Sequence, residues 1–318
     1  MLTKSLLTIF FVLVLVFSAA APTVAMGFGF HLLHPEEIKL AAANRNNSEE
    51  FFVTVPFALN DRREAVWNEF FRLAQENRIT PLVRLVTQSD NHIWPRPTKR
   101  QIVDAANFFR RLNWPGPRYI IVFNEPNHAN EWGGEINPDD YAKTALFVAS
   151  WLKTEPYPYV ILPAGLDAAA PNGPDTRDSF VFLEQMLNAE PDFLESFDGW
   201  TSHSYPNPDF TAPPYRTGKN SLRGFESELN FLRRYGKGDL PVYITETGWR
   251  ATKSITPRLK SYYQTAVTKI WNHPQVKAVT VFVLQGNPGP FKEFSLLNSD
   301  NSPSLQLNAL NQVIKNLD

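Results

Sequence analysis

The sequence predicts an α/β protein that folds as a single (β/α)8 barrel, the TIM barrel architecture. Short apolar runs alternate eight times with longer segments of helical periodicity over about 290 residues. No linker, low-complexity tract or internal repeat interrupts this alternation. The 318 residues are 43% hydrophobic and 20% charged, an ordinary globular composition that would suit one large barrel or two smaller domains. The alternation, and not the composition, therefore favours the barrel.

Eight apolar runs are expected to form the strands. The most informative is Tyr119–Phe123 (YIIVF), because a run without polar alternation is typical of a strand buried on both faces of a parallel sheet. In chain order the expected strands are Phe28–Leu33, Phe51–Val55, Pro81–Val86, Tyr119–Phe123, Tyr159–Leu162, Gly199–Ser202, Pro241–Thr245 and Val279–Leu284.

The segments between these runs carry apolar residues at helical spacing, and several begin with a recognisable start signal. Asp61 is a candidate N-cap, Thr98 and Gln101 form a capping box, and Asn137 and Thr256 each precede a proline at the first turn. Four helices are expected to start at these signals, and four more to occupy Pro35–Ala43, Asp178–Asn188, Ser221–Tyr235 and Ser304–Leu317.

The alternative α/β fold is an open, doubly wound sheet. That fold would want a glycine-rich phosphate-binding turn after an early strand. The stretch Phe28–Pro35 contains nothing of that form, so the barrel remains the prediction.

The N-terminal segment has the order of a secretory signal peptide. Lys4 precedes the apolar run Leu6–Phe17, and small residues follow up to Ala25. We therefore expect residues 1–25 to be a signal peptide and residues 26–318 to be the barrel domain, which would be secreted. The alternative is an uncleaved anchor that leaves the domain attached outside the cytoplasm, although the run is shorter than the ~20 residues of a typical membrane span.

Charge, cysteine and histidine usage exclude several classes of function. The formal net charge of -1 offers no basic surface for nucleic acid. The chain has no cysteine, so a secreted form would depend on its hydrophobic core and not on disulfides. The six histidines form no metal-binding pair on a predicted helix. Neither a metal nor another cofactor is expected.

Two glutamates follow buried strands and are the candidate catalytic residues. Glu125 ends the fourth strand and Glu246 the seventh, and the carboxyl ends of barrel strands meet at one mouth. A lone glutamate after a strand is commonly a capping or solvated acid. Two facing carboxylates, however, are what hydrolysis of a glycosidic bond requires. A separation of about 5 Å would imply retention of anomeric configuration, and one above about 6.5 Å inversion.

Three short motifs at the strand ends resemble clan A glycoside hydrolases, most nearly families 5 and 39. They are Asn124-Glu125-Pro126, Ser202-His203-Ser204-Tyr205 and Thr245-Glu246-Thr247-Gly248-Trp249, and the likeness extends in order over almost the whole mature chain. The resemblance implies a retaining mechanism with Glu125 as general acid/base and Glu246 as nucleophile. The second acid must then stay ionised while the first holds a proton, so hydrogen-bond donors should gather around Glu246.

The resemblance also implies roles for four neighbouring residues. Asn124 would hydrogen-bond the 2-hydroxyl of the sugar, His203 would line the same subsite, and Tyr205 would donate its phenol proton to the nucleophile. Arg84 is a candidate for the arginine that some members place beside the nucleophile, although it lies inside the third strand and not at its tip.

Tryptophans on the loops after strands are candidates for stacking on sugars, because their rings pack on apolar C–H faces. Trp94, Trp132 and Trp249 belong to this group, whereas Trp67, Trp151 and Trp271 lie in predicted helices and are expected in the core. The resembled families often place a tryptophan after strand eight. Here that stretch begins with Phe282, so either Phe282 or Trp249 is expected to replace it, or the pocket has a different shape and takes a different sugar.

The function these observations favour is a secreted, retaining glycoside hydrolase. It would cleave O-glycosidic, β-linked bonds in a polysaccharide or oligosaccharide by double displacement with two glutamates. One alternative is a non-catalytic barrel that binds glycans, and another is an exported barrel with an unrelated partner. The last would predict that the acids and aromatic rings do not converge at the mouth.

Overall fold

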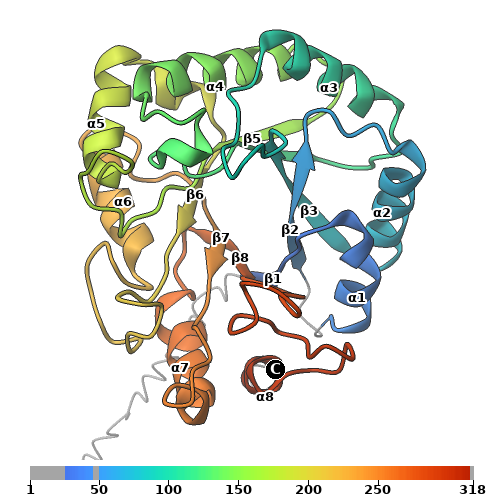
Figure 1. The fold of residues 1–318 in the computed structure, drawn as a ribbon, viewed down its shortest axis with the longest axis vertical. Helices are drawn as coiled ribbons and strands as arrows, with labels where there is room; N and C mark the ends of the chain where they lie inside the picture. Colours follow the sequence, from blue (N-terminus) through green and yellow to red (C-terminus); the bar gives the residue numbers. More distant parts are fainter. Residues whose placement is uncertain (1–25, 46–49, 316–318) are drawn as a thin grey trace, which may run out of the picture.

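The computed structural model describes residues 26–45 and 50–315, which form one ring of strands surrounded by helices (Figure 1). The predicted signal peptide, residues 1–25, lies outside the described residues, so its prediction stands untested. Within the described ranges no helix is both long enough and apolar enough to cross a lipid bilayer.

Each of the eight strands overlaps a predicted run, although the eighth begins and ends three residues earlier than the predicted Val279–Leu284. They are β1 (Gly27–His31), β2 (Phe51–Ala58), β3 (Ile79–Val86), β4 (Arg118–Val122), β5 (Tyr159–Pro163), β6 (Trp200–His203), β7 (Val242–Thr247) and β8 (Val276–Val281). Paired neighbours are parallel, in the order β5-β4-β3-β2-β1-β8-β7-β6. The two end strands approach each other through the Asp198 amide, which donates to the Ile161 carbonyl over 2.9 Å, and through a bridge between Asp167 and His203. The predicted (β/α)8 barrel is therefore confirmed.

The helices follow the strands in alternation. They are α1 (Ile38–Ala43), α2 (Glu64–Glu76), α3 (Lys99–Arg111), α4 (Pro138–Leu152), α5 (Ser179–Ala189), α6 (Gly224–Arg233), α7 (Leu259–Thr265) and α8 (Leu305–Ile314). The capping box at Thr98 and the Asn137 cap are present as predicted. Two start signals are corrected. Asp61 accepts a hydrogen bond from the Trp67 indole instead of capping α2, and Thr256 begins a 3-10 turn before α7.

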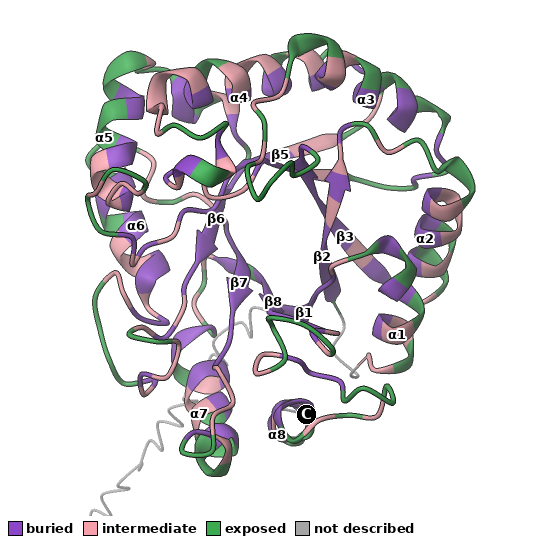
Figure 2. Ribbon diagram, viewed as in Figure 1, coloured by how far each residue is buried: buried purple, intermediate pink, exposed green. Residues whose placement is uncertain are grey.

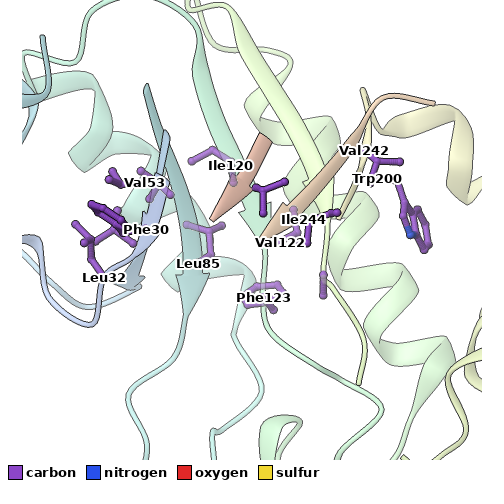
Figure 3. Close-up of a cluster of buried hydrophobic side chains, with 14 of the residues drawn as sticks. Phe30, Leu32, Val53, Leu85, Ile120, Val122, Phe123, Trp200, Val242 and Ile244 are labelled. Atoms are coloured by element: carbon purple, nitrogen blue, oxygen red, sulfur yellow. The ribbon is translucent and has the colours of Figure 1, made fainter. Parts of the chain in front are cut away.

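The strands separate an outer and an inner set of apolar side chains, as period-two alternation requires. The outer set, part of which is drawn in Figure 3, packs against the helices. The buried sides of the helices face the strands and their exposed sides face solvent (Figure 2). The outer set includes Val53, Leu85, Ile120, Val122 and Ile244. The inner set fills the barrel with one residue from each of six strands: Phe52, Leu82, Ile121, Leu162, Tyr243 and Ala278.

Above this inner set lies a polar layer that comes two residues later in β2, β3 and β8 and includes the residue of β1 that pairs with Thr54. It consists of His31, Thr54, Arg84 and Thr280, all buried. The Thr54 and Thr280 hydroxyls lie 2.8 Å apart, and Thr280 donates to the Thr245 carbonyl over 2.9 Å. Two strand steps toward the carboxyl ends thus change the barrel interior from apolar to polar, and this layer supports the mouth of the barrel.

Candidate active site

Glu125 and Glu246 converge at the carboxyl-terminal mouth of the barrel. One carboxylate oxygen of each acid and one ring nitrogen of His203 all lie within 4.8 Å of one another. The Glu125 side chain is 21% exposed and that of Glu246 is 11% exposed. The pair is therefore partly desolvated and still reachable from solvent.

Irregular pairing between β6 and β7 turns Glu246 toward this mouth. Ile244 packs in the outer core, so regular alternation would point Glu246 outward as well. The register shifts instead, because Ser202 pairs with Ile244 while the next residue, His203, pairs with Glu246. A bulge of this kind redirects a side chain and is common beside active sites.

A second local distortion places Glu125. Phe123 and Glu125 both have positive φ angles, of 74° and 28°, a backbone conformation that residues other than glycine rarely adopt. The turn sends the Phe123 ring outward against Trp132, with ring centroids 5.4 Å apart. Asn124 and Glu125 remain at the mouth, and the Glu125 amide donates to the Gly165 carbonyl over 3.1 Å.

Hydrogen-bond donors surround Glu246, as the sequence led us to expect. Arg84 donates to Oε1 over 2.5 Å, and the Tyr205 hydroxyl donates to Oε2 over 3.0 Å. His31 Nε2 lies 3.4 Å from Oε1. Burial alone would raise the pKa of Glu246, but the cationic Arg84, which also donates a hydrogen bond, outweighs burial together with any positive charge that the neighbouring imidazoles of His203 and His31 take up on protonation, and the pKa stays well below its usual range. Glu246 is therefore an ionised carboxylate at neutral pH.

Tyr205 is the matching donor. Burial, followed by the charges of Glu246 and Glu125, raises its pKa well above the usual value for a phenol. The hydroxyl therefore stays protonated and donates a hydrogen bond to Glu246. In the structure the Tyr205 phenol thus orients the Glu246 carboxylate, as the motif resemblance implied.

His203 links the two acids. Its Nδ1 lies 2.6 Å from Glu125 Oε1, and its Nε2 lies 3.3 Å from Arg84. Since a guanidinium can only donate, Nε2 accepts a hydrogen bond from Arg84. Nδ1 therefore carries the ring proton and donates a hydrogen bond to Glu125. Burial lowers the pKa of His203 and the two carboxylates raise it, with a net rise. A second ring proton would, however, point at Arg84, so the neutral tautomer fits these contacts.

A glycine makes room for the His203 ring. A Cβ at Gly165, just after β5, would come within 2.3 Å of His203 Cδ2. The same cluster has the spacing of cation ligands, but a cation would have to break the bond between His203 and Glu125 and sit beside the positive Arg84. The donor set therefore favours acid chemistry over metal binding.

Residues 91–310 match the model of the glycosyl hydrolase catalytic core family. The chain belongs to this family. It is a glycosidase, and its resemblance to clan A glycoside hydrolases is confirmed.

Several solved structures share the fold of this glycosyl hydrolase. A glucosidase from Croceicoccus marinus has a TM-score of 0.67 at 12% identity, covering 93% of this chain and 68% of its own. A GH5_18 protein from Streptomyces cattleya, in complex with GlcNAc, scores 0.61 at 14% identity over 92% and 80%. An endo-β-1,4-glucanase from Xanthomonas axonopodis pv. citri scores 0.54 at 12% identity over 92% and 99%. No curated protein matches the sequence.

The glycosyl hydrolase places its three candidate tryptophans differently. Trp94 is half-buried at the mouth and lines a small space together with Asn124. Trp132 packs against Phe123 and Tyr141 with 1% of its surface exposed. Its ring offers no open face to a sugar, so the stacking expected of Trp132 is not supported.

Trp249 is also in the core, with 0% of its surface exposed. Its ring contacts Tyr262 and Tyr263, and its indole donates to the Ala212 carbonyl over 2.9 Å. The expected contact of Trp249 with a sugar is therefore not supported either. Trp249 follows Glu246 of β7 by three residues, which suggested a position at the mouth, but its ring packs against α7.

Phe282 is the aromatic residue after β8 that borders the acids. Its ring centroid lies 5.1 Å from that of His31 and 6.4 Å from that of Tyr205. Phe291 packs across it at 5.0 Å. Of the two expected replacements for a tryptophan, Phe282 is the one at the site.

Two further site residues escaped the sequence analysis. His31 is 4% exposed, and neither of its ring nitrogens forms a hydrogen bond with the described residues. Burial and the Arg84 charge lower its pKa to about 3, so it is neutral. Glu131 lies near Asn124, and burial followed by the Glu125 charge raises its pKa to about 7. A polar residue ending an otherwise apolar strand was the available signal for His31.

Proposed function

We propose that the protein is a secreted glycosidase that cleaves β-linked bonds in a polysaccharide or oligosaccharide with retention of configuration. The observation that carries the proposal is the approach of the Glu125 and Glu246 oxygens to within 4.8 Å. Retaining enzymes hold their carboxyl groups about 5–5.5 Å apart, whereas inverting enzymes need about 6.5–9.5 Å to fit a water. The spacing supports direct attack by one of the acids.

In the proposed first step, Glu246 attacks the anomeric carbon and Glu125 protonates the departing glycosidic oxygen. Glu246 suits the role of nucleophile because Arg84 and Tyr205 keep it ionised and aimed. Glu125 Oε1 can accept the hydrogen bond from His203 Nδ1, while Oε2 carries the proton that passes to the leaving oxygen. Glu125 then takes a proton from water, which releases the sugar from Glu246.

Asn124 is the proposed partner of the sugar 2-hydroxyl. Its buried Oδ1 has no hydrogen-bond partner among the described residues. A hydroxyl that donates to this oxygen would satisfy it, and such bonds strengthen in the transition state. Trp94 lines a small space together with Asn124, and Phe282 contacts His31 and Tyr205 beside Glu246.

The test separates the roles of the two acids. A fluorosugar that traps the covalent intermediate should label the peptide containing Glu246 in the wild type and leave Glu246→Gln unlabelled. On a dinitrophenyl β-glycoside, whose leaving group needs no acid, Glu125→Gln should still form the intermediate but release sugar slowly. Labelling of Glu125, or full rate in either variant, would reject the assignment. Glycan binding without turnover by the wild type would reject hydrolysis itself.

Secretion is part of the proposal and rests on residues 1–25 alone. The order of Lys4, the apolar run Leu6–Phe17 and the small residues up to Ala25 supports it. Expression of the full chain with N-terminal sequencing of the exported product is the test. A product beginning at Met26 is expected, and a membrane-bound product that retains Met1 would instead indicate an anchor.

A further inference from the structure

A cavity of about 500 Å³ lies beside the catalytic mouth and takes no part in the chemistry described so far. It is formed by the loop between β3 and α3 and the loop between β4 and α4. Its lining includes Asp90, Asn91, Ile93, Arg96 and Glu135. Both loops leave the carboxyl ends of strands, where barrel enzymes bind their substrates. A volume of this size is typical of a ligand site.

The wall on the β3 side is a preformed turn. Asp90 and Ile93 exchange backbone hydrogen bonds of 2.8 and 2.9 Å around Asn91 and His92. The two central residues have φ angles of 48° and 64°, as a tight two-residue turn requires. The turn leaves Ile93 42% exposed at the cavity, in a loop that is largely exposed (Figure 2). Because the turn already fixes the backbone of Ile93, the loop loses little conformational entropy when a ligand packs against this side chain.

Backbone hydrogen bonds fasten the two loops together. The Trp94 amide donates to the Asn130 carbonyl over 2.7 Å, and the Gly133 amide donates to the Trp94 carbonyl over 2.8 Å. Arg96 lies across Gly133, where a Cβ would come within 2.8 Å of the arginine Cγ. The cavity is therefore built from two loops that hold each other in place.

The charges of the cavity favour a neutral ligand. Arg96 is already paired, since it lies 2.5 Å from Glu135 and 3.5 Å from Asp140. Asp90 and Glu135 add carboxylate oxygens that can accept from hydroxyl groups. A uronate or sulfated sugar would face like charges here, whereas a neutral hexose would find acceptors beside the apolar surface of Ile93.

The cavity adjoins a small space beside the catalytic site, with which it shares the lining residue Pro95. Trp94, Asn124 and Glu131 line a small space of about 10 Å³, and Pro95 borders both this space and the large cavity. Asn124 is the neighbour of Glu125 in the chain. A glycan whose scissile bond lies at Glu125 would reach the large cavity by passing the Trp94 ring.

We propose that this cavity is an outer subsite that binds a further neutral sugar unit of the glycan cleaved between Glu125 and Glu246. The inference rests on the proposed function, because the occupant is part of the same substrate. It predicts that longer neutral oligosaccharides are cleaved better than short ones, with Ile93 supplying apolar contact and Asp90 accepting hydroxyl hydrogen bonds.

The test is a length series of β-linked gluco-, manno- and xylo-oligosaccharides. The measured quantity is the ratio of kcat/KM for the longest to the shortest substrate of the series that is cleaved. Ile93→Ser should lower this ratio about tenfold, the size expected for losing one apolar side-chain contact. Tyr235→Ser is the matched control, because Tyr235 is 41% exposed but follows α6 at the opposite end of the barrel. A ratio equal to that of the wild type in Ile93→Ser overturns the proposal.

A second arm separates the outer subsite from the proposed function. If no series is cleaved, hydrolysis of β-glycans fails as the function, and calorimetric binding of the same oligosaccharides decides the subsite. Weaker binding of the longest oligosaccharides to Ile93→Ser than to Tyr235→Ser supports it. Equal binding to both variants, or tighter binding of oligoglucuronates than of neutral chains to the wild type, rejects it.

Discussion

Replacing Arg84 by methionine tests the electrostatic support of the nucleophile most directly. Arg84 is 4% exposed and lies 2.5 Å from Glu246 Oε1, so Arg84→Met keeps most of the volume and removes the charge. Removing one partner of a buried ion pair costs about 3–5 kcal/mol. If about 3 kcal/mol of this appears in the transition state, kcat/KM falls about 150-fold.

The same change should move the pH dependence of activity. In the wild type the pKa of Glu246 is held well below its usual range, so the nucleophile stays ionised as the pH falls. Without the guanidinium, burial weighs more heavily and raises that pKa. An acidic limb should therefore appear in the kcat/KM profile of Arg84→Met between about pH 4 and 7, where the wild type shows none from this group.

The assay is steady-state hydrolysis of an aryl β-glycoside across this pH range, with thermal melts to show that each variant is folded. Arg84→Lys is the matched control, because it keeps the charge but loses the planar fork. It should lose rate without gaining the acidic limb. A folded Arg84→Met variant with the pH profile of the wild type and a rate within about twofold would refute the reasoning.

Three further predictions follow from single contacts. Tyr205→Phe removes the 3.0 Å hydrogen bond to the nucleophile. It should lower kcat/KM about 10- to 100-fold, because hydrogen bonds to charged groups contribute about 1.5–3 kcal/mol. A change under twofold in steady-state kinetics would contradict this. His31 has a pKa of about 3 in the fold and about 6.5 when unfolded, so its contribution to stability is present above about pH 6.5 and is lost as the pH falls toward 3. Urea unfolding of His31→Gln should therefore show a smaller loss of stability between about pH 7 and 4 than the wild type, and an equal loss would disprove it. Gly165→Ala forces a Cβ to within 2.3 Å of the His203 ring and should cost about 1–3 kcal/mol in thermal stability along with activity, unlike Gly173→Ala, whose Cβ would be 3.6 Å from its nearest neighbour among the described residues.

The barrel could be predicted because its signals are local. Eight apolar runs and the capping box at Thr98 are properties of neighbouring residues; the capping box is present and a strand overlaps each run. The start of α2 was misplaced for the opposite reason. Asp61 has the side chain of a cap, but its carboxylate is used by the Trp67 indole and the Arg63 amide, a choice that depends on the folded chain.

The site was predictable only in part, because some of its members depend on which way a strand side chain points. The convergence of Glu125 and Glu246 follows from strand order, but the register shift that turns Glu246 inward leaves no mark in the sequence. Arg84 looked too deep in its strand, yet its long side chain rises from the polar layer to the nucleophile. Trp132 and Trp249 occupy loop positions in the sequence, and only packing shows that their rings are core.

The polar layer beneath the acids separates two kinds of evolutionary change. The groups that hold the nucleophile, His31 and Arg84, rise from β1 and β3 inside the barrel, whereas the proposed sugar contacts at Ile93 and Trp94 belong to loops. Insertions, deletions and substitutions in those loops can change which glycan fits without disturbing the acid chemistry. Proteins descended from this chain can therefore change their glycan specificity through substitutions in the rim loops. Substitutions in the polar layer would instead abolish hydrolysis of every glycan.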